Sequence, residues 1–470
     1  MTLRCAGCRA VVGAEPGQPW PWRCPHSADG DDIDHVLGLQ LHPPALELAA
    51  SDSENPFVRY RGRLCSYRLW RAAGRDDQSF IALVDGLDGA VARVAGHGFR
   101  VTPMARFPDL DAAVGARVWV KDETGNVAGS HKGRHLFGVL LLLEVLDQLG
   151  HGIPGDLAIA SCGNAALAAA TLAAAGGLAG AGGLRAAGGL AAAGGLASAG
   201  SLRAAGGLAA AGGLAAATPM GAARRRLTAF VPADADPTVV ARLTELGAAV
   251  EPCPRDGLPA DPCYRRFRQA VAAGAIPFSC QGPDNAFAIE GASTLAWEVA
   301  DARPRGLDRA VIQVGGGALA AGCVRGFQRW PAPPVLDTVQ TASAHPLQRA
   351  VERLQGRMAA GAPMDAALAE AARHRSRFMW PWESEPASVA RGILDDETYD
   401  WLALARAMLT SGGTAVVAGE SALAEANVLA RSATGIAVDP TGSAGLAGLL
   451  LLARSGQVPA DSEILVIFTG

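Results

Sequence analysis

From about residue 115 onward, short apolar runs rich in β-branched residues alternate with stretches of helical character. A strand followed by a helix, repeated, is typical of an α/β protein with mainly parallel sheets. Ligands in such folds bind at the carboxyl ends of strands, where helix N-termini present free N–H groups, so the chemistry should lie in strand-to-helix turns. The predicted strands are Arg117–Val120, Asp156–Ala160, Leu227–Val231, Ala310–Val314, Val335–Gln340, Thr414–Ala418, Gly435–Val438 and Ile464–Phe468.

One segment departs from this alternation. From Gly176 to Leu214, a Gly-Gly pair followed by Leu recurs every six residues, with Ser201 once in place of a glycine. Six is neither a helical nor a strand period, and two glycines per hexad cost a helix about 1.5–2 kcal/mol relative to alanine. A left-handed β-helix and a membrane span are alternatives, although Arg185 and Arg203 interrupt the run. We expect residues 176–217 to be a low-complexity expansion in a surface loop or helix extension.

The amino-acid composition of the chain excludes several classes of function. With 470 residues, 50% of them hydrophobic, the chain can bury a large core in two or three lobes. A net charge of −4 without a basic stripe argues against nucleic-acid or membrane partners. Nine cysteines spread through core-like segments favour free thiols or a metal site over a disulfide framework. No apolar run follows Met1–Arg9, so we expect no secretory signal and a cytoplasmic location.

The first candidate turn is Lys121–Arg134, in which a strand leads through glycines to Lys132 at the start of the apolar helix Leu136–Leu149. By position alone, Lys132 could be an ordinary solvated lysine. Whether Lys132 has a functional role depends on two further strand-to-helix turns.

The second turn is Ala160–Ala166, where Ser161, Asn164 and the first backbone N–H groups could hold a carboxylate with help from the helix dipole. The same residues could equally be a simple helix cap.

In the third turn, Val311–Gly322, three glycines after a strand let backbone N–H groups surround a phosphate. It matches neither a Walker loop nor a dinucleotide fingerprint.

In this order, the segments resemble the fold-type II pyridoxal-phosphate (PLP) family, which includes threonine synthase, threonine dehydratase and tryptophan synthase β. That family carries an Asn-Pro-Thr-Gly-Ser-Phe-Lys-Asp-Arg-like segment, a Ser-Gly-Asn-Ala loop, a glycine-rich phosphate loop and a terminal Ser/Thr-Gly. The resemblance covers about residues 100–470 apart from the hexads. Its matching segments here are Asn126–Arg134, Ser161–Ala165, Gly315–Gly317 and Thr469–Gly470, with Glu290–Thr294 and Asp439–Gly445 similar to segments between them.

The resemblance implies a role for each matching residue. Lys132 would hold PLP as a Schiff base and remove the proton from the substrate Cα. A hydroxyl facing the pyridine nitrogen does not keep it protonated, which favours elimination or replacement over transamination. The implied contacts are Asn164 with the cofactor 3′-oxygen, Ser161 and the backbone of Cys162, Gly163, Asn164 and Ala165 with the substrate carboxylate, Gly315, Gly316, Gly317 and Ala318 with the phosphate, and Thr469 with the pyridine nitrogen.

Departures from the family pattern guide the choice of reaction. His131 replaces the usual aromatic residue, as in tryptophan synthase β, and Ala128 and Gly133 replace the Thr and Asp of the threonine synthase segment. We therefore expect a PLP-dependent lyase that acts on a small hydroxy- or phosphohydroxy-amino acid by elimination. The alternatives are a threonine synthase-like β,γ-replacement on a phosphorylated homoserine and a catalytically silent PLP-binding protein.

The N-terminal segment carries a separate candidate site. Cys5 and Cys8, followed by Cys24 and His26, resemble a small zinc ribbon with four tetrahedral ligands. Unligated cysteines or a vestigial site are the alternatives.

The expected fold is thus a two-lobed α/β fold-type II PLP enzyme with mainly parallel sheets and a short Cys-containing N-terminal segment. We expect a homodimer. The expected parts are the Cys-containing segment 1–30, an N-terminal part of the large lobe at 31–132, a smaller lobe at 133–255 that carries the hexads, and the large PLP-binding lobe at 256–470.

Overall fold

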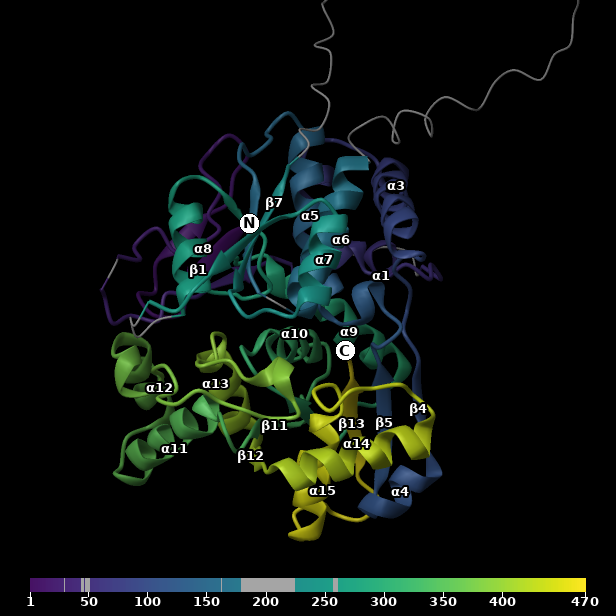
Figure 1. The fold of residues 1–470 in the computed structure, drawn as a ribbon, viewed down its shortest axis with the longest axis vertical. Coiled ribbons are helices and arrows are strands. Elements are labelled where there is room, and N and C mark those ends of the chain that lie inside the picture. The colour runs from purple at the N-terminus through teal and green to yellow at the C-terminus, as the bar shows by residue number, and fades with distance from the viewer. Residues whose placement is uncertain (29, 44–45, 47–50, 162, 179–224, 257–260) are drawn as a thin grey trace, which may run out of the picture.

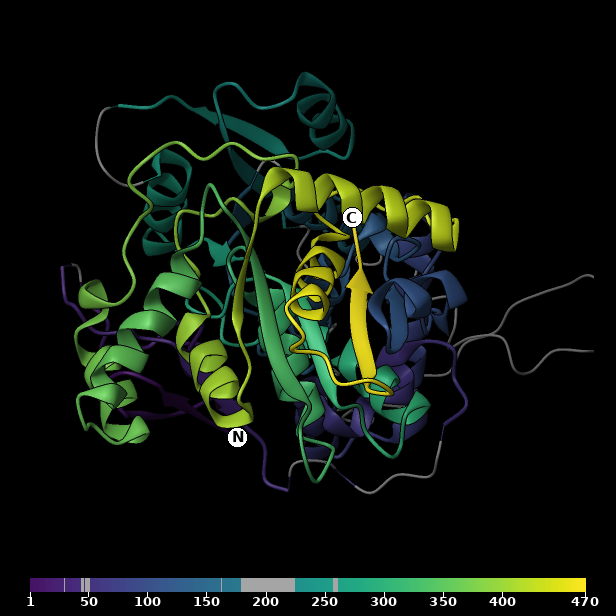
Figure 2. The ribbon, with the colours of Figure 1, turned by 90° about the horizontal axis from the view of Figure 1, so that it is seen from below.

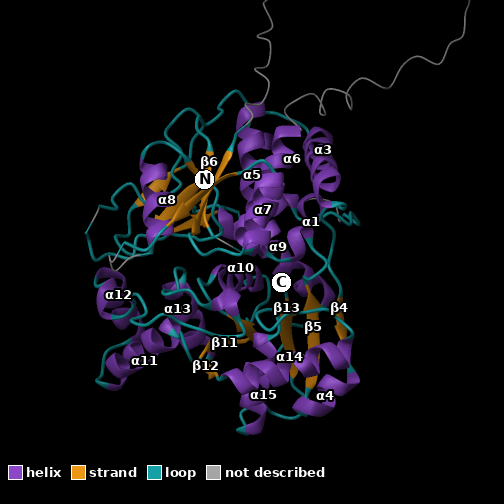
Figure 3. Cartoon of the chain, viewed as in Figure 1, coloured by secondary structure: helices purple, strands orange, loops and turns teal. Residues whose placement is uncertain are grey.

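The computed structural model describes residues 1–28, 30–43, 46, 51–161, 163–178, 225–256 and 261–470. The described chain forms two lobes, each built on a mainly parallel sheet with helices on its faces (Figures 1 and 3). A small antiparallel sheet from the N-terminus lies beside the upper lobe of Figure 1. The predicted α/β architecture is confirmed.

The large lobe is organised around a six-stranded sheet of order β12-β11-β10-β13-β5-β4. All neighbours are parallel except the edge pair β4 and β5, and β13 lies in the middle of the sheet (Figure 2). The strands are β4 (Met104–Arg106), β5 (Arg117–Asp122), β10 (Arg309–Gln313), β11 (Val335–Thr341), β12 (Ala415–Ala418) and β13 (Glu463–Phe468).

Both faces of the central strands of this sheet are buried, which explains the apolar runs in β10 and β13. In β13, Ile464, Val466 and Phe468 face one core, whereas Leu465 and Ile467 face the other. Helices α4 (Pro108–Val114), α14 (Glu420–Thr434) and α15 (Ala444–Arg454) form the first core. The second core contains α9 (Ala288–Ala302), α10 (Ala318–Phe327), α11 (Pro346–Ala359), α12 (Met364–Arg373) and α13 (Trp401–Ser411).

The smaller lobe contains a four-stranded parallel sheet of order β8-β7-β6-β9. Its central helix, α5 (Lys132–Gln148), is buried on nearly every side and packs against α6 and α9, as expected for a helix without a polar face. The other elements are β6 (Leu157–Ala160), β7 (Leu227–Pro232), β8 (Ala249–Cys253), β9 (Ile276–Pro277), α6 (Asn164–Leu178), α7 (Pro237–Glu245) and α8 (Pro262–Ala272).

The remaining N-terminal residues form a three-stranded antiparallel sheet and three helices. The sheet has the order β2-β1-β3, and its apolar residues pack against α5 and Phe287. The elements are β1 (Thr2–Cys5), β2 (Val11–Gly13), β3 (Leu37–Gln40), α1 (Pro56–Arg59), α2 (Cys65–Ala72) and α3 (Asp77–Ala95). Among the described helices, none is both long and apolar enough to cross a membrane.

One predicted strand is wrong. Gly435–Val438 is an irregular segment, because α14 runs to Thr434 and Gly435, with φ 71°, ends the helix in the left-handed conformation. The smaller sheet also continues past the expected boundary at residue 255, since β9 pairs with β6. Of the hexad segment, Gly176–Leu178 form the last turn of α6, and residues 179–217 lie outside the described part.

Candidate functional site

Three neighbouring strands of the large sheet deliver three of the predicted segments to one edge. Strand β13 lies between β5 and β10 and runs parallel to both. Residues 123–131 follow β5, Thr469 and Gly470 follow β13, and the glycine loop Gly315–Gly317 follows β10. Because parallel strands end at the same edge, the candidate lysine, hydroxyl and phosphate loop converge between the lobes.

The turn before Lys132 is held by local hydrogen bonds. The Asn126 side chain accepts from Val127 N at 2.8 Å and donates to Glu123 Oε2 at 2.8 Å. Ala128 (φ 58°) and Gly129 (φ 70°) then adopt left-handed conformations, which reverse the chain just before α5. Lys132 therefore begins α5 at a defined position.

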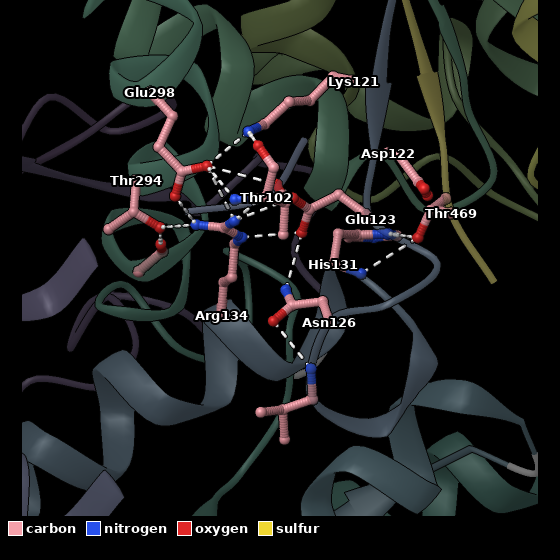
Figure 4. Close-up of polar contacts among 12 residues, drawn as sticks. Thr102, Lys121, Asp122, Glu123, Asn126, His131, Arg134, Thr294, Glu298 and Thr469 are labelled. Carbon is pink, nitrogen blue, oxygen red and sulfur yellow. Dashed lines mark hydrogen bonds and ion pairs between the residues drawn. The ribbon is translucent and has the colours of Figure 1, made fainter. Parts of the chain in front are cut away.

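A buried network of charges lies directly behind this turn (Figure 4). Arg134 donates to Glu123 Oε2 at 2.8 Å and to Glu298 Oε1 at 2.5 Å. Lys121 donates to Glu298 Oε2 at 2.6 Å. All four side chains are at most 1% exposed, and two cations balance two anions, so the desolvated charges compensate one another.

This network joins the two lobes to the lysine segment. Arg134 is two residues beyond Lys132 in α5, whereas Glu298 belongs to α9. A Cβ on Gly291 would lie 2.1 Å from the Arg134 carbonyl oxygen, so the glycine permits the close approach of the helices. The neighbouring Arg134 and Lys121 cations lower the pKa of Glu123 against the opposing effect of burial, which keeps this carboxylate ionised.

The chain contains only two lysines, Lys121 and Lys132. Lys121 is 1% exposed and hydrogen-bonded to Glu298 and to the Thr102 carbonyl oxygen. Lys132 is partly exposed. Of the two lysines, Lys132 is therefore the one with an accessible amine that could carry a carbonyl cofactor.

Thr469 lies against the residue that precedes this lysine. Its Oγ1 accepts from His131 N at 3.1 Å and is 3.0 Å from His131 Nδ1 (Figure 4). Burial, together with the nearby positive charge of Lys132, lowers the pKa of His131 well below its usual range. A neutral imidazole and a hydroxyl thus meet at the end of β13.

Asn164 approaches the same place from the smaller lobe, at the N-terminus of α6. A Cβ on Gly470 would lie 3.7 Å from Asn164 Nδ2, and Gly470 N donates to Gly129 O at 3.1 Å. Ser161 Oγ accepts from Gly163 N at 3.3 Å, as in a capped turn. Cys162 lies outside the described residues, and Ala165 packs at the edge of the adjoining core.

The glycine loop is covered by residues 394–400, which the sequence analysis did not identify. Thr398 Oγ1 donates to Gly315 O at 2.9 Å, and Asp400 N donates to Gly316 O at 3.1 Å. The Asp395 carboxylate accepts from the Gly316 N–H, and a Cβ on Gly315 would lie 2.2 Å from Asp395 Oδ2. An anionic oxygen of the protein itself therefore occupies the first part of the predicted phosphate loop.

Burial shifts the acidities around the loop. It raises the pKa of Asp395 to about 6, although Lys132 and the Gly316 N–H oppose the shift. It also raises the pKa of Asp400 to about 7 against the Gly282 N–H, and that of the Cys280 thiol to about 12. Ionisable groups with shifted pKa values are characteristic of functional sites, and here they surround an amine and a candidate anion-binding loop.

The sequence carried only a weak signal for this cover. Residues 395–400 include four acidic side chains and precede α13 without a preceding strand, so they resemble a solvated loop. Their function follows only from the fold, which returns them to the Gly315–Gly317 loop.

The N-terminal candidates also come together, with one change. Cys5, Cys8 and Cys24 place their sulfur atoms beside His35, which the sequence analysis did not select. His26 Nδ1 lies 3.9 Å from Cys8 Sγ and outside that group of four.

The interlobe residues fit pyridoxal phosphate. Ser130 Oγ is buried and has no hydrogen-bond partner among the described residues. The Gly316 N–H already receives a carboxylate oxygen, as it would a phosphate oxygen, and the loop opens the helix α10 (Ala318–Phe327). Lys132 supplies an amine next to His131, Thr469 a hydroxyl in contact with His131, and Asn164 an amide beside Gly470.

Comparison with known proteins agrees with this geometry. A threonine synthase from Methanocaldococcus jannaschii is 26% identical over 187 residues, which are 40% of this chain and 42% of that protein. Among solved structures, maize serine racemase superposes with a TM-score of 0.54 at 17% identity, covering 82% of this chain and 92% of that one. Threonine deaminase isoform 2 from Solanum lycopersicum gives 0.54 at 14% identity, covering 84% and 90%. At such identities the structures show a shared fold.

The family of pyridoxal-phosphate-dependent enzymes matches residues 96–181 and 192–470. This match covers most of the chain and includes all four segments that meet between the lobes. The protein belongs to the family of pyridoxal-phosphate-dependent enzymes.

Proposed function

We infer that this protein is a PLP-dependent lyase that eliminates the β-substituent of a small hydroxy- or phosphohydroxy-amino acid. The observation that carries the proposal is that the accessible Lys132 directly follows His131, whose backbone N–H and ring contact the Thr469 hydroxyl at the end of β13. A carboxylate in that place would hold a pyridine nitrogen protonated, whereas Thr469 beside neutral His131 does not.

The residues divide the task between the lobes. Lys132 would hold the cofactor and then accept the proton from the substrate Cα. Ser161, Asn164 and the backbone from Cys162 to Ala165, at the start of α6, would bind the substrate carboxylate, and Asn164 would also reach the cofactor 3′-oxygen. Gly315, Gly316, Gly317 and Ala318 would bind the phosphate. When bound, the cofactor supplies the electron sink for the pair left at Cα.

Two other functions have some support. The similarity to a threonine synthase favours β,γ-replacement on a phosphorylated homoserine. The carboxylate of Asp395 on the Gly316 N–H favours a catalytically silent protein, because this group competes for the phosphate loop.

Borohydride reduction followed by peptide mapping tests the lysine. We expect a single cofactor adduct on Lys132 and none in Lys132→Arg, since the other lysine is buried in an ion pair. Lys121→Arg, which keeps the charge beside Glu298, is the matched control and should retain the adduct. An adduct on Lys121 in the parent protein would contradict the assignment.

A substrate panel then separates the three functions. Keto-acid release from serine, threonine or phosphoserine supports elimination, whereas threonine and phosphate formed from phosphohomoserine support replacement. A Lys132 adduct without turnover of any substrate supports the silent protein.

A further inference from the structure

Three cysteines near the N-terminus and His35 form a compact group. Their four possible ligand atoms all lie within 4.8 Å of one another. Cys8 Sγ is 3.7 Å from Cys24 Sγ, and Cys5 Sγ is 3.5 Å from His35 Nδ1. A tetrahedral zinc ion with bonds of about 2.3 Å to sulfur and 2.0–2.1 Å to nitrogen requires edges of about 3.8 Å and 3.6 Å. Both measured edges match these values.

The backbone around the sulfur atoms has the form of a metal-binding turn. Cys5 ends β1, and Arg9 adopts φ 65°, a conformation that is uncommon for a residue with a side chain. The turn closes with Cys5 N donating to Ala10 O at 2.9 Å. The N–H of Ala10 in turn points at Cys8 Sγ, and that of His26 at Cys24 Sγ, so backbone donors surround the sulfur atoms.

A carboxylate lies beside the histidine. Asp31 Oδ2 lies 3.2 Å from His35 Nε2, and this carboxylate is itself fixed by the N–H groups of Ala28 (2.8 Å) and Ile33 (3.2 Å). The negative charge of this carboxylate beside Nε2 favours the tautomer with the proton on that nitrogen and leaves Nδ1 free to ligate, although Nε2 has no hydrogen-bond partner among the described residues.

We propose that Cys5, Cys8, Cys24 and His35 bind one zinc ion in a closed tetrahedral site. Three thiolates and one imidazole suit zinc, and four protein ligands leave no position for water or substrate, so the site is structural. Cys5 and Cys24 are 0% and 4% exposed, and the His35 side chain is 6% exposed. His26, which makes an exposed contact with Cys8, then lies beside the site and is not a ligand.

The site connects to the cofactor loop through the residue before His35. Asp34 Oδ1 accepts from Arg375 Nε at 3.2 Å and from Trp401 Nε1 at 3.3 Å, and Arg375 also pairs with Glu397 at 2.8 Å. Glu397 belongs to residues 394–400, which cover Gly315 and Gly316. Zinc would therefore stabilise the segment that supports this cover.

Elemental analysis of the purified full chain tests the proposal. We expect about one equivalent of zinc per chain, more than five-fold less in His35→Ala, and an unchanged content in His26→Ala, the matched control. Asp31→Asn, which removes the negative charge beside His35 and leaves the four proposed ligands in place, should lower zinc affinity about 10- to 100-fold in a competition with a chelating dye. His35→Cys should restore binding, since a fourth thiolate also fits a tetrahedral site.

Substitution with Co²⁺ gives a second readout. A site of three sulfur ligands and one nitrogen ligand should produce intense visible absorption and a sulfur-to-cobalt charge-transfer band, both absent in His35→Ala. Parent protein without zinc or cobalt binding would overturn the proposal. Loss of metal in His26→Ala with retention in His35→Ala would overturn the ligand assignment.

Discussion

Asp395 occupies a position where its charge should control cofactor binding. Its carboxylate accepts from the Gly316 N–H, and burial raises its pKa to about 6. Below pH 6 the protonated acid no longer competes as an anion for the loop, and above pH 6 the carboxylate both competes for the N–H and repels a phosphate. Cofactor affinity should therefore fall as the pH rises through 6.

Asp395→Asn should relieve this competition. A hydrogen bond to a charged group contributes about 1.5–3 kcal/mol, so the variant should bind PLP about ten-fold more tightly at pH 8 and with less difference at pH 5. Fluorescence titration at both pH values measures the effect. Because free phosphate also ionises near pH 6, the parent protein titrated in parallel is the reference. Unchanged affinity with a raised KM would instead place Asp395 on the substrate.

Thr469 offers a test of the reaction type. Thr469→Asp would place a carboxylate next to the expected position of the cofactor nitrogen. A hydrogen bond to a charged group contributes about 1.5–3 kcal/mol, which shifts a protonation equilibrium ten-fold or more. We expect slower keto-acid release and more transamination product, whereas Thr469→Ser should resemble the parent. Equal product ratios in the Asp variant would mean that Thr469 contacts only His131.

At the scale of elements, the charges between α5 and α9 should matter more for stability than surface pairs. Removing one partner of a buried ion pair leaves an uncompensated charge, so Arg134→Met should lower the free energy of unfolding by about 3–5 kcal/mol. Arg454→Met breaks an exposed ion pair with Glu425 and is the matched control. It should leave the free energy of unfolding unchanged within error. Urea unfolding measures both variants, and equal stabilities would contradict a structural role for the network.

Several elements could be predicted because their patterns are local. The buried strands β5, β6, β7, β10, β11, β12 and β13 coincide with apolar runs, since parallel strands are covered on both faces. The short edge strands β4 and β9 lack such runs, and the helical period of α14 continues to the residue before Gly435, where a strand was expected.

The long-range contacts of the site could not be predicted from local pattern. Lys132, Asn164, Gly315–Gly317 and Thr469 were identified by their resemblance to a family. The approach of Asp395 to Gly316 and of His35 to Cys5 depends on how distant segments return in the fold. A single sequence contains no periodic signal for such pairs.

For the whole molecule, the hexad segment is the feature most easily removed. The described ends, α6 and β7, already bury Leu172, Ala175 and Leu227 in the core. Because each doubling of loop length costs only about 0.6 kcal/mol, deletion of residues 180–217 should change the melting temperature little and leave PLP binding intact. Differential scanning calorimetry measures this. A large fall in melting temperature would mean that the deleted residues contribute to the core.

The central place of β13 in the large sheet has a consequence for biosynthesis. The smaller sheet uses strands from residues 157–277 only, so a growing polypeptide can complete it while translation continues. In the large sheet, β5 and β10 have no common neighbour until residues 463–468 leave the ribosome. Non-local pairing of this kind is slow and exposes apolar surface in the meantime. The nascent protein should therefore acquire its smaller lobe first and depend on chaperones until the last strand is inserted.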